Sequence, residues 1–215
     1  MKRKLSVARN LLILSSFNFL IAACDVFSGM QSSNGNGSTS TPPISTPSSC
    51  TDGSSNYPWL RVGNELSYAY KGTVKSDSMI VKVISSPSAG SYKTEVRYPA
   101  ASKTNIVYYH ACGQDLYTSS NGNYQQYGHW WFSISVLVND IWSRQVPGIL
   151  YTYQLMSKNA TAYTALRHQT FTNCYKFTGH DPFNSITDTI YFKPNTGIVY
   201  FSGTKETYEL VKKNF

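Results

Sequence analysis

Residues 188–201 read "DTIYFKPNTGIVYF", in which two runs rich in β-branched and aromatic residues flank the turn-forming segment Pro194-Asn195-Thr196-Gly197. Runs of this length and composition are typical of β-strands, and Pro and Gly mark the tight turns that join them. The stretch therefore predicts an antiparallel pair of strands near the end of the chain.

The same pattern extends over residues 57–215. Apolar residues alternate at Leu66-Tyr68-Tyr70, at Met79-Val81-Val83 and at Phe132-Ile134-Val136-Val138, the last with Ser133 and Ser135 on the opposite face. Further strand-like runs are "NIVYYHA", "GILYTYQLM", "NCYKFTG" and "TYELVKK", and turn residues separate them. Short strands with turns between them predict a mainly β fold, a single twisted antiparallel sheet that is half-barrel or barrel-like. The one helix that we allow is a short one within residues 118–131.

The first residues have the features of an export signal. Lys2, Arg3, Lys4 and Arg9 precede an apolar segment that runs from Leu11 to Ala23. A basic start followed by a short apolar core is typical of a secretory signal peptide. A membrane-spanning helix is the alternative, but a span needs about 20 apolar residues and this run is shorter.

The apolar segment ends on Ile21-Ala22-Ala23-Cys24, which resembles the lipobox of bacterial lipoproteins. That resemblance implies a diacylglycerol joined to the Cys24 sulfur through a thioether, with cleavage of the chain before Cys24. Two or more acyl chains anchor a protein stably where one does not. We therefore expect attachment to a membrane of the cell envelope, inner or outer, with the domain outside the cytoplasm.

A polar spacer separates the anchor from the folded part. Residues 24–56 are rich in Ser, Gly, Thr and Pro, a composition that predicts a disordered linker. The chain thus divides into a signal peptide (1–23), a lipidated spacer (24–56) and a β domain (57–215). Removal of the signal peptide leaves 15 of the 19 Lys and Arg against 11 Asp and Glu, and only Lys212 and Lys213 are adjacent basic residues in the domain. Scattered charge of this kind argues against nucleic acid as a partner.

Three stretches of the domain resemble a broad, largely uncharacterised group of bacterial exported lipoproteins. They are "WLRVGNELSYAY", "QTFTNCYKF" and "DTIYFKPNTGIVYF" with the following "TYELV". The resemblance covers most of residues 57–215 and implies a twisted or half-barrel antiparallel sheet. Its motifs are structural, so it carries over no functional residues.

Three cysteines remain after Cys24, which is an odd number for an oxidising compartment. We expect a disulfide between Cys112 and Cys174, both within the β domain. Pairing of Cys50 with Cys112 and two buried free thiols are the alternatives. A zinc site formed by His110, Cys112, Cys174 and His180 matches no familiar ligand spacing, so we predict no metal.

No catalytic motif is present. The chain has no Gly-x-Ser-x-Gly elbow, no His-Glu-x-x-His and no phosphate-binding glycine loop. A hydrolytic triad would need His168 or His129, Asp181 or Asp140 and a serine, but the spacing of these residues matches no known hydrolase motif. We therefore predict a protein that is not an enzyme and that uses no cofactor.

Aromatic residues are the one compositional excess, with 17 Tyr, 10 Phe and 4 Trp. On a strand the adjacent Trp130 and Trp131 cannot both face inward, so the outward one is expected to line a ligand or partner site. The sequence favours a non-catalytic envelope binding module for an apolar or amphipathic ligand or for a protein partner. A structural envelope or surface protein is the second hypothesis, and an envelope hydrolase is the third.

Overall fold

The computed structural model describes residues 51–119, 122, 129–146, 149–166, 168–181 and 186–215, which form one antiparallel sheet of twelve strands. The only helical elements in these residues are two 3-10 turns, η1 (Ser54–Asn56) and η2 (Pro99–Ala101). Neither is long and apolar enough to span a membrane. The strands are β1 (Glu65–Lys71), β2 (Ser78–Ser88), β3 (Ser91–Tyr98), β4 (Lys103–Cys112), β5 (Asp115–Ser119), β6 (His129–Ser133), β7 (Ile141–Val146), β8 (Ile149–Thr164), β9 (Gln169–Asp181), β10 (Ile186–Lys193), β11 (Gly197–Ser202) and β12 (Thr207–Lys213).

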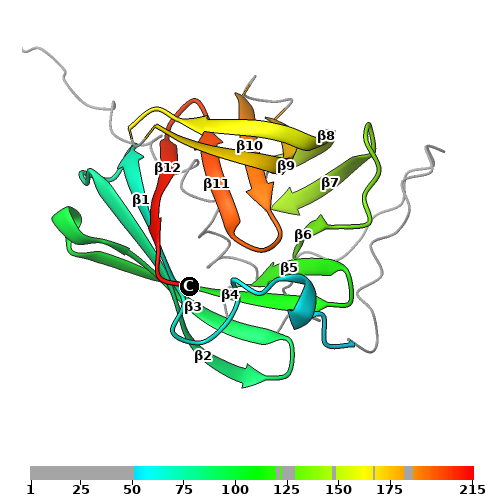
Figure 1. Ribbon diagram of the computed structural model, residues 1–215, viewed down its shortest axis with the longest axis horizontal. Helices are drawn as coiled ribbons and strands as arrows, with labels where there is room; N and C mark the ends of the chain where they lie inside the picture. Colours follow the sequence, from blue (N-terminus) through cyan, green and yellow to red (C-terminus); the bar gives the residue numbers. More distant parts are fainter. Residues whose placement is uncertain (1–50, 120–121, 123–128, 147–148, 167, 182–185) are drawn as a thin grey trace, which may run out of the picture.

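Neighbouring strands of the sheet are consecutive in the chain, except that β1 pairs with β12. The sheet runs β6-β5-β4-β3-β2-β1-β12-β11-β10-β9-β8-β7, so the first and last strands pair with each other in its middle. Strands β6 and β7 are its two edges, and the sheet is curved but not closed (Figure 1). The expected class, a single antiparallel sheet, is confirmed.

One aromatic core lies against the sheet. Strand β1 alternates half-buried and buried positions, and Leu66, Tyr68 and Tyr70 are the buried ones. Burial of such a side chain contributes about 1.5–3 kcal/mol of stability before entropy is counted. The largest fully buried aromatic side chains are Tyr57, Tyr109, Phe132, Tyr153, Phe177, Phe192, Phe201 and Tyr208.

The turn that follows β10 has the predicted form. Gly197 has a φ of +96°, a region that side-chain-bearing residues seldom adopt. A Cβ at this position would also lie 3.2 Å from Cδ1 of Leu66 and 3.3 Å from Cδ2 of Trp59. Glycine is therefore required here both for the backbone conformation and for close packing against the core.

The expected strand over residues 132–138 is wrong. Strand β6 ends at Ser133, and the Ser133 hydroxyl lies 2.7 Å from the Ser135 hydroxyl and accepts a hydrogen bond from the Ser135 backbone N–H. Serine side chains that bond locally to the backbone compete with strand pairing. The alternation breaks as well, because Val138 is exposed while Ser133 is buried.

The segment before the predicted domain boundary packs against the sheet. Residues 51–53 run beside the end of β4, where the Gly53 N–H donates to the carbonyl of Ala111 (2.9 Å) and the Gly113 N–H to that of Thr51 (2.7 Å). Asp52 forms an isolated antiparallel bridge with Cys112. The described part of the domain thus begins before Tyr57.

Candidate functional site

The described residues form an open groove of about 450 Å³ between the start of β9 and the end of β12. Volumes of this size are typical of sites for small molecules. Its lining residues come from two strands that are not neighbours in the sheet, and they are Gln169, Thr170, Phe171, Leu210, Val211, Lys212 and Lys213.

The groove exists because two strands diverge. Strands β11 and β12 pair only from Ser202 opposite Thr207 to Tyr200 opposite Glu209, although β12 continues to Lys213. Beyond that point β12 stays paired with β1, through a register shift at Ser67 and Tyr68 that leaves Val211 without a partner residue. A bulge of this kind bends the strand that carries the extra residue.

The long β8–β9 hairpin forms the other wall. It crosses near the end of β11 and the start of β12 (Figure 1), and the backbone N–H of Leu166 donates to Oε2 of Glu209 at 3.1 Å. Strand β9 pairs with β10 only from Tyr175 onward, so residues 169–174 reach past β10 toward β12. The hairpin thereby places Phe171 opposite the diverging part of β12.

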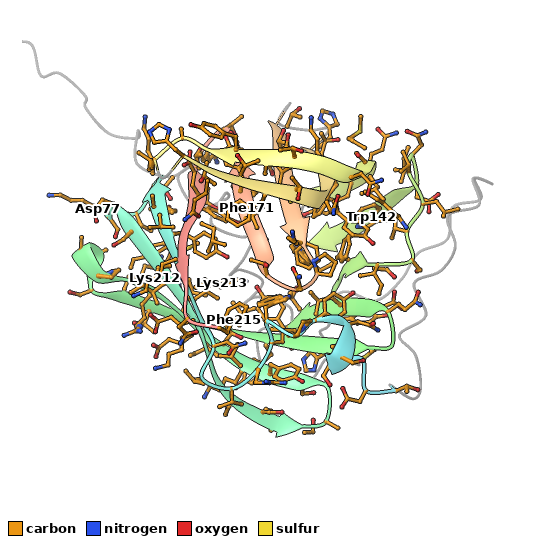
Figure 2. The ribbon with its side chains drawn as sticks, viewed as in Figure 1. Asp77, Trp142, Phe171, Lys212, Lys213 and Phe215 are labelled. Carbon is orange, nitrogen blue, oxygen red and sulfur yellow. The ribbon has the colours of Figure 1, made fainter. Side chains whose placement is uncertain are left out.

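The groove has an apolar side and a basic end. Phe171 packs against the core and Leu210 is buried, whereas Lys212 and Lys213 are exposed. Figure 2 shows both lysines and Phe215 toward the C-terminal end of β12, below Phe171. The Lys213 ammonium lies 4.9 Å from the centre of the Phe215 ring, a cation–π distance. A groove with an apolar wall and an exposed lysine near one end can hold the apolar part of a ligand beside an anionic group.

The tryptophan pair behaves differently from the sequence prediction. Trp131 is only 3% exposed and packs edge-on against Phe177 and Phe192, at ring-centre distances of 6.1 and 5.4 Å. It is a core residue and lines no described groove. The side chain of Trp130 lies outside the described residues, so its predicted contact role stays a prediction.

The predicted disulfide between Cys112 and Cys174 is wrong. Cys174 is a free, buried thiol whose sulfur lies 3.4 Å from the carbonyl oxygen of Phe171, and burial raises its pKa. Cys112 is disulfide-bonded, at the end of β4. Cys24 and Cys50 lie outside the described residues.

His110 is fully buried between two serines. Its Nδ1 lies 2.9 Å from the Ser91 hydroxyl and its Nε2 lies 3.0 Å from the Ser119 hydroxyl. Burial lowers the pKa of His110 to about 4, so the ring is neutral at physiological pH. Both ring nitrogens are engaged in hydrogen bonds, and no cluster of potential metal ligands occurs among the described residues.

A half-buried carboxyl group lies at the turn before β12. The Tyr70 hydroxyl donates to Oε2 of Glu206 at 3.1 Å, and burial raises the pKa of Glu206 to about 7. Tyr98 and Tyr208 are close enough for the Glu206 charge to raise the pKa of their hydroxyls further. Aromatic side chains of the core therefore lie close to the carboxyl group of Glu206.

His168 and Asp140, two candidates for a catalytic triad, make hydrogen bonds to nearby residues of their own hairpin or turn. The Tyr163 hydroxyl bonds to Nδ1 of His168 within the exposed tip of the β8–β9 hairpin. Asp140 accepts a hydrogen bond from the backbone N–H of Leu137 at 2.7 Å. The side chains of His129 and Asp181 lie outside the described residues.

Sequence reasoning missed most of the groove. Its only signal was the adjacent pair Lys212 and Lys213, because nothing local marks Phe171 or Leu210 as neighbours. Comparison of the chain with protein-family models, with curated proteins and with solved structures gives no match. The functional conclusion therefore depends on the geometry of the groove.

Proposed function

We propose that the protein is a lipid-anchored, non-catalytic binding module of the bacterial cell envelope. In this proposal Cys24 carries the lipid, the polar spacer holds the domain away from the membrane, and the groove between β9 and β12 receives the apolar part of an amphipathic ligand. The observation that carries the proposal is the groove itself, a volume of about 450 Å³ that the half-buried residues Phe171 and Val211 help to line.

The polar contacts of the described residues support binding over hydrolysis. His168 bonds to a tyrosine of its own hairpin, and Asp140 holds a turn. His110 lies between two buried serines, away from the groove-lining residues. A catalytic base needs a partner within reach of a substrate, and these side chains serve the local structure instead.

The proposal can be tested with N-phenyl-1-naphthylamine, a neutral apolar dye whose fluorescence rises when it leaves water. The full chain should bind the dye, and Phe171→Ala and Val211→Asn should each weaken that binding at least fivefold. Tyr163→Ala, a change to a 55% exposed aromatic residue of the same hairpin, is the matched control and should leave binding unchanged. Dye binding that neither groove variant affects would refute the proposal.

A structural envelope protein is the second candidate, and the filled interior favours it. The ring centre of Phe132 lies 5.8 Å from that of Phe177 and 4.6 Å from that of Phe192. Close packing of this kind leaves little room for a ligand inside the sheet. If the full chain binds no dye and no amphiphile, this second function replaces the first.

A further inference from the structure

The connection between β6 and β7 carries an exposed apolar patch. Leu137 is 65% exposed and Ile141 is 63% exposed, and Val138 between them is exposed as well. Met156 of β8 is also exposed, and it lies on the same face of the sheet as Ile141, because Ile141 pairs with Gln154, two residues before Met156. Exposed apolar residues that gather in one place usually mark a contact with a partner or a membrane.

Hydrogen bonds fix the conformation of this patch. The Asp140 N–H donates to the carbonyl of Leu137 at 3.0 Å, and the Leu137 N–H donates to Oδ2 of Asp140 at 2.7 Å. These two bonds close a tight turn with Val138 and Asn139 at its centre, and Asn139 has the positive φ (74°) that such a turn requires. The Asn139 N–H then donates to the carbonyl of Leu155 at 2.8 Å, which joins the turn to β8. A defined backbone conformation therefore presents Val138 at the tip of the turn.

The start of the described chain lies beside the same part of the domain. The Gly113 N–H donates to the carbonyl of Thr51 at 2.7 Å, and the Ile134 N–H donates to the carbonyl of the next residue, Gln114, at 3.1 Å. Thr51 and the first residue after β6 are thus both bonded to the two-residue turn between β4 and β5. Figure 1 shows the start of the described chain and the connection from β6 to β7 on the same side of the domain, at the right of the view.

The length of chain before Thr51 limits how the domain can turn. In the proposed function Cys24 is anchored, so residues 25–50 join the bilayer to Thr51. A flexible chain of that length has an r.m.s. span of about 30 Å, which is shorter than the width of about 40 Å expected for a domain of this size. The side of the domain that carries Thr51 would therefore be the side nearest the membrane.

On the basis of the proposed lipid anchor, we infer that the patch of Leu137, Val138, Ile141 and Met156 docks the domain onto the surface of the bilayer that holds the lipid. These side chains enter the boundary between headgroups and acyl chains, where they leave water. The bilayer is the occupant because the tether brings this side of the domain to it at a high effective concentration. The spacer sets how far the domain can move away, and the patch sets which side faces the membrane.

Quenching of a fluorescent label by lipid tests the inference on the lipid-anchored protein. Val138→Cys in a Cys174→Ser background carries the label NBD at the turn, and Leu137→Cys is a second labelled position in case the first label disturbs the turn. Leu166→Cys carries the label at the exposed tip of the β8–β9 hairpin, which Figure 1 shows on the opposite side of the domain. The Cys174→Ser protein without an added cysteine gives the background signal.

Each labelled protein is reconstituted into vesicles of phosphatidylcholine and phosphatidylglycerol in equal parts, with and without nitroxide-labelled lipid. Docked side chains lie within the boundary region of the bilayer, so we expect the nitroxide lipid to quench the label at position 138 about twofold or more, and the label at position 166 much less.

A double variant tests whether the apolar side chains cause the docking. With the label kept at position 138, Leu137→Ser with Ile141→Ser should lower the ratio of docked to undocked domains about tenfold or more, because two largely exposed aliphatic side chains no longer enter the bilayer. The matched control is Tyr163→Ser with Leu166→Ser, a change at two side chains of similar exposure on the β8–β9 hairpin. It should leave the quenching at position 138 unchanged.

Flotation of the vesicles separates this inference from the proposed function. If the protein floats with the vesicles but the labels at positions 138 and 166 are quenched equally or not at all, the anchor stands and the docking surface is wrong. Quenching at position 138 that survives Leu137→Ser with Ile141→Ser would also overturn the inference. A dimer in sedimentation that this double variant dissociates, without quenching at position 138, would assign the patch to a contact between copies of the chain. Absence of the protein from the floating vesicles would overturn both the anchor and the inference.

Discussion

The hydroxyl of Tyr70 on β1 donates a 3.1 Å hydrogen bond to Oε2 of Glu206 in the turn between β11 and β12. This contact joins the first strand to the last hairpin, so that residues 136 positions apart share one part-buried polar site. Burial raises the pKa of Glu206 to about 7 from an ordinary value of 4.5. Between about pH 4.5 and 7 the folded protein therefore keeps a proton on this carboxyl group that the unfolded chain releases.

The pH dependence of stability follows from that difference. Between about pH 4.5 and 7 the native state binds more protons than the unfolded state, so the free energy of unfolding falls as the pH rises through this range. Glu206→Gln keeps an oxygen acceptor for Tyr70 and removes the charge. We expect it to flatten the decline and to raise stability at pH 8 by about 1–3 kcal/mol in denaturant unfolding. Glu209→Gln is the matched control, and an unaltered slope in Glu206→Gln would contradict the prediction.

His110 should act in the opposite direction. Its pKa is lowered from 6.5 to about 4 by burial, so below pH 6.5 the unfolded state binds the extra proton. The free energy of unfolding should fall as the pH drops from 6.5 toward 4, and His110→Gln should remove that part of the loss even if it lowers stability overall. Unfolding curves at pH 4.5 and 7 measure the slope. His168→Gln, at the exposed hairpin tip, should keep the native slope.

Trp131 should behave as a core residue. It is 3% exposed, and its ring packs edge-on against Phe177 and Phe192. Trp131→Ala should therefore cost about 3–5 kcal/mol of unfolding free energy, as buried aromatic residues do. Tyr163→Ala, at an exposed position, should cost less than about 1 kcal/mol. A small cost for Trp131→Ala in equilibrium denaturation would show that the ring is not part of the core.

The fold class was predictable because its signals are local. Alternation of apolar residues at Leu66, Tyr68 and Tyr70 predicted a strand with one buried face, and the turn at Gly197 joins two strands as expected. Strands β3, β5 and β7 were not predicted individually. The pairing of β1 with β12 was also out of reach, because no short segment of sequence specifies a contact between the two ends of a domain.

The site was less predictable because it depends on where strands separate. The groove forms because β11 and β12 are joined by only three residue pairs and because the start of β9 extends past the end of β10. The burial of both Trp131 and Phe132 has a similar origin. Alternation along a strand predicts one inward side chain of such a pair, but packing from other parts of the chain can cover both faces.

The cysteines give a fourth prediction. Because Cys174 is a free thiol and Cys112 is disulfide-bonded, Cys174→Ser should leave the Cys112 disulfide intact. Residues 51–53 lie beside the end of β4, so we expect the partner to be Cys50, which directly precedes them in the chain. Peptide mapping without reduction should show Cys50 linked to Cys112. A peptide that links Cys112 to Cys174, or alkylation of Cys112 in the native protein, would contradict this assignment.

The last prediction concerns the anchor. Cys24 is the cysteine at the end of the apolar leader segment, and thioether attachment needs its sulfur. Cys24→Ser should therefore remove the acylated N-terminal peptide seen by mass spectrometry and should move the protein from the detergent-dependent membrane fraction to the soluble fraction. Two or more acyl chains hold a protein on a bilayer far more strongly than one, so the shift should be nearly complete. Cys174→Ser is the matched control, since it removes a thiol that is buried in the domain. Unchanged membrane association of Cys24→Ser would show that something other than this lipid holds the protein there.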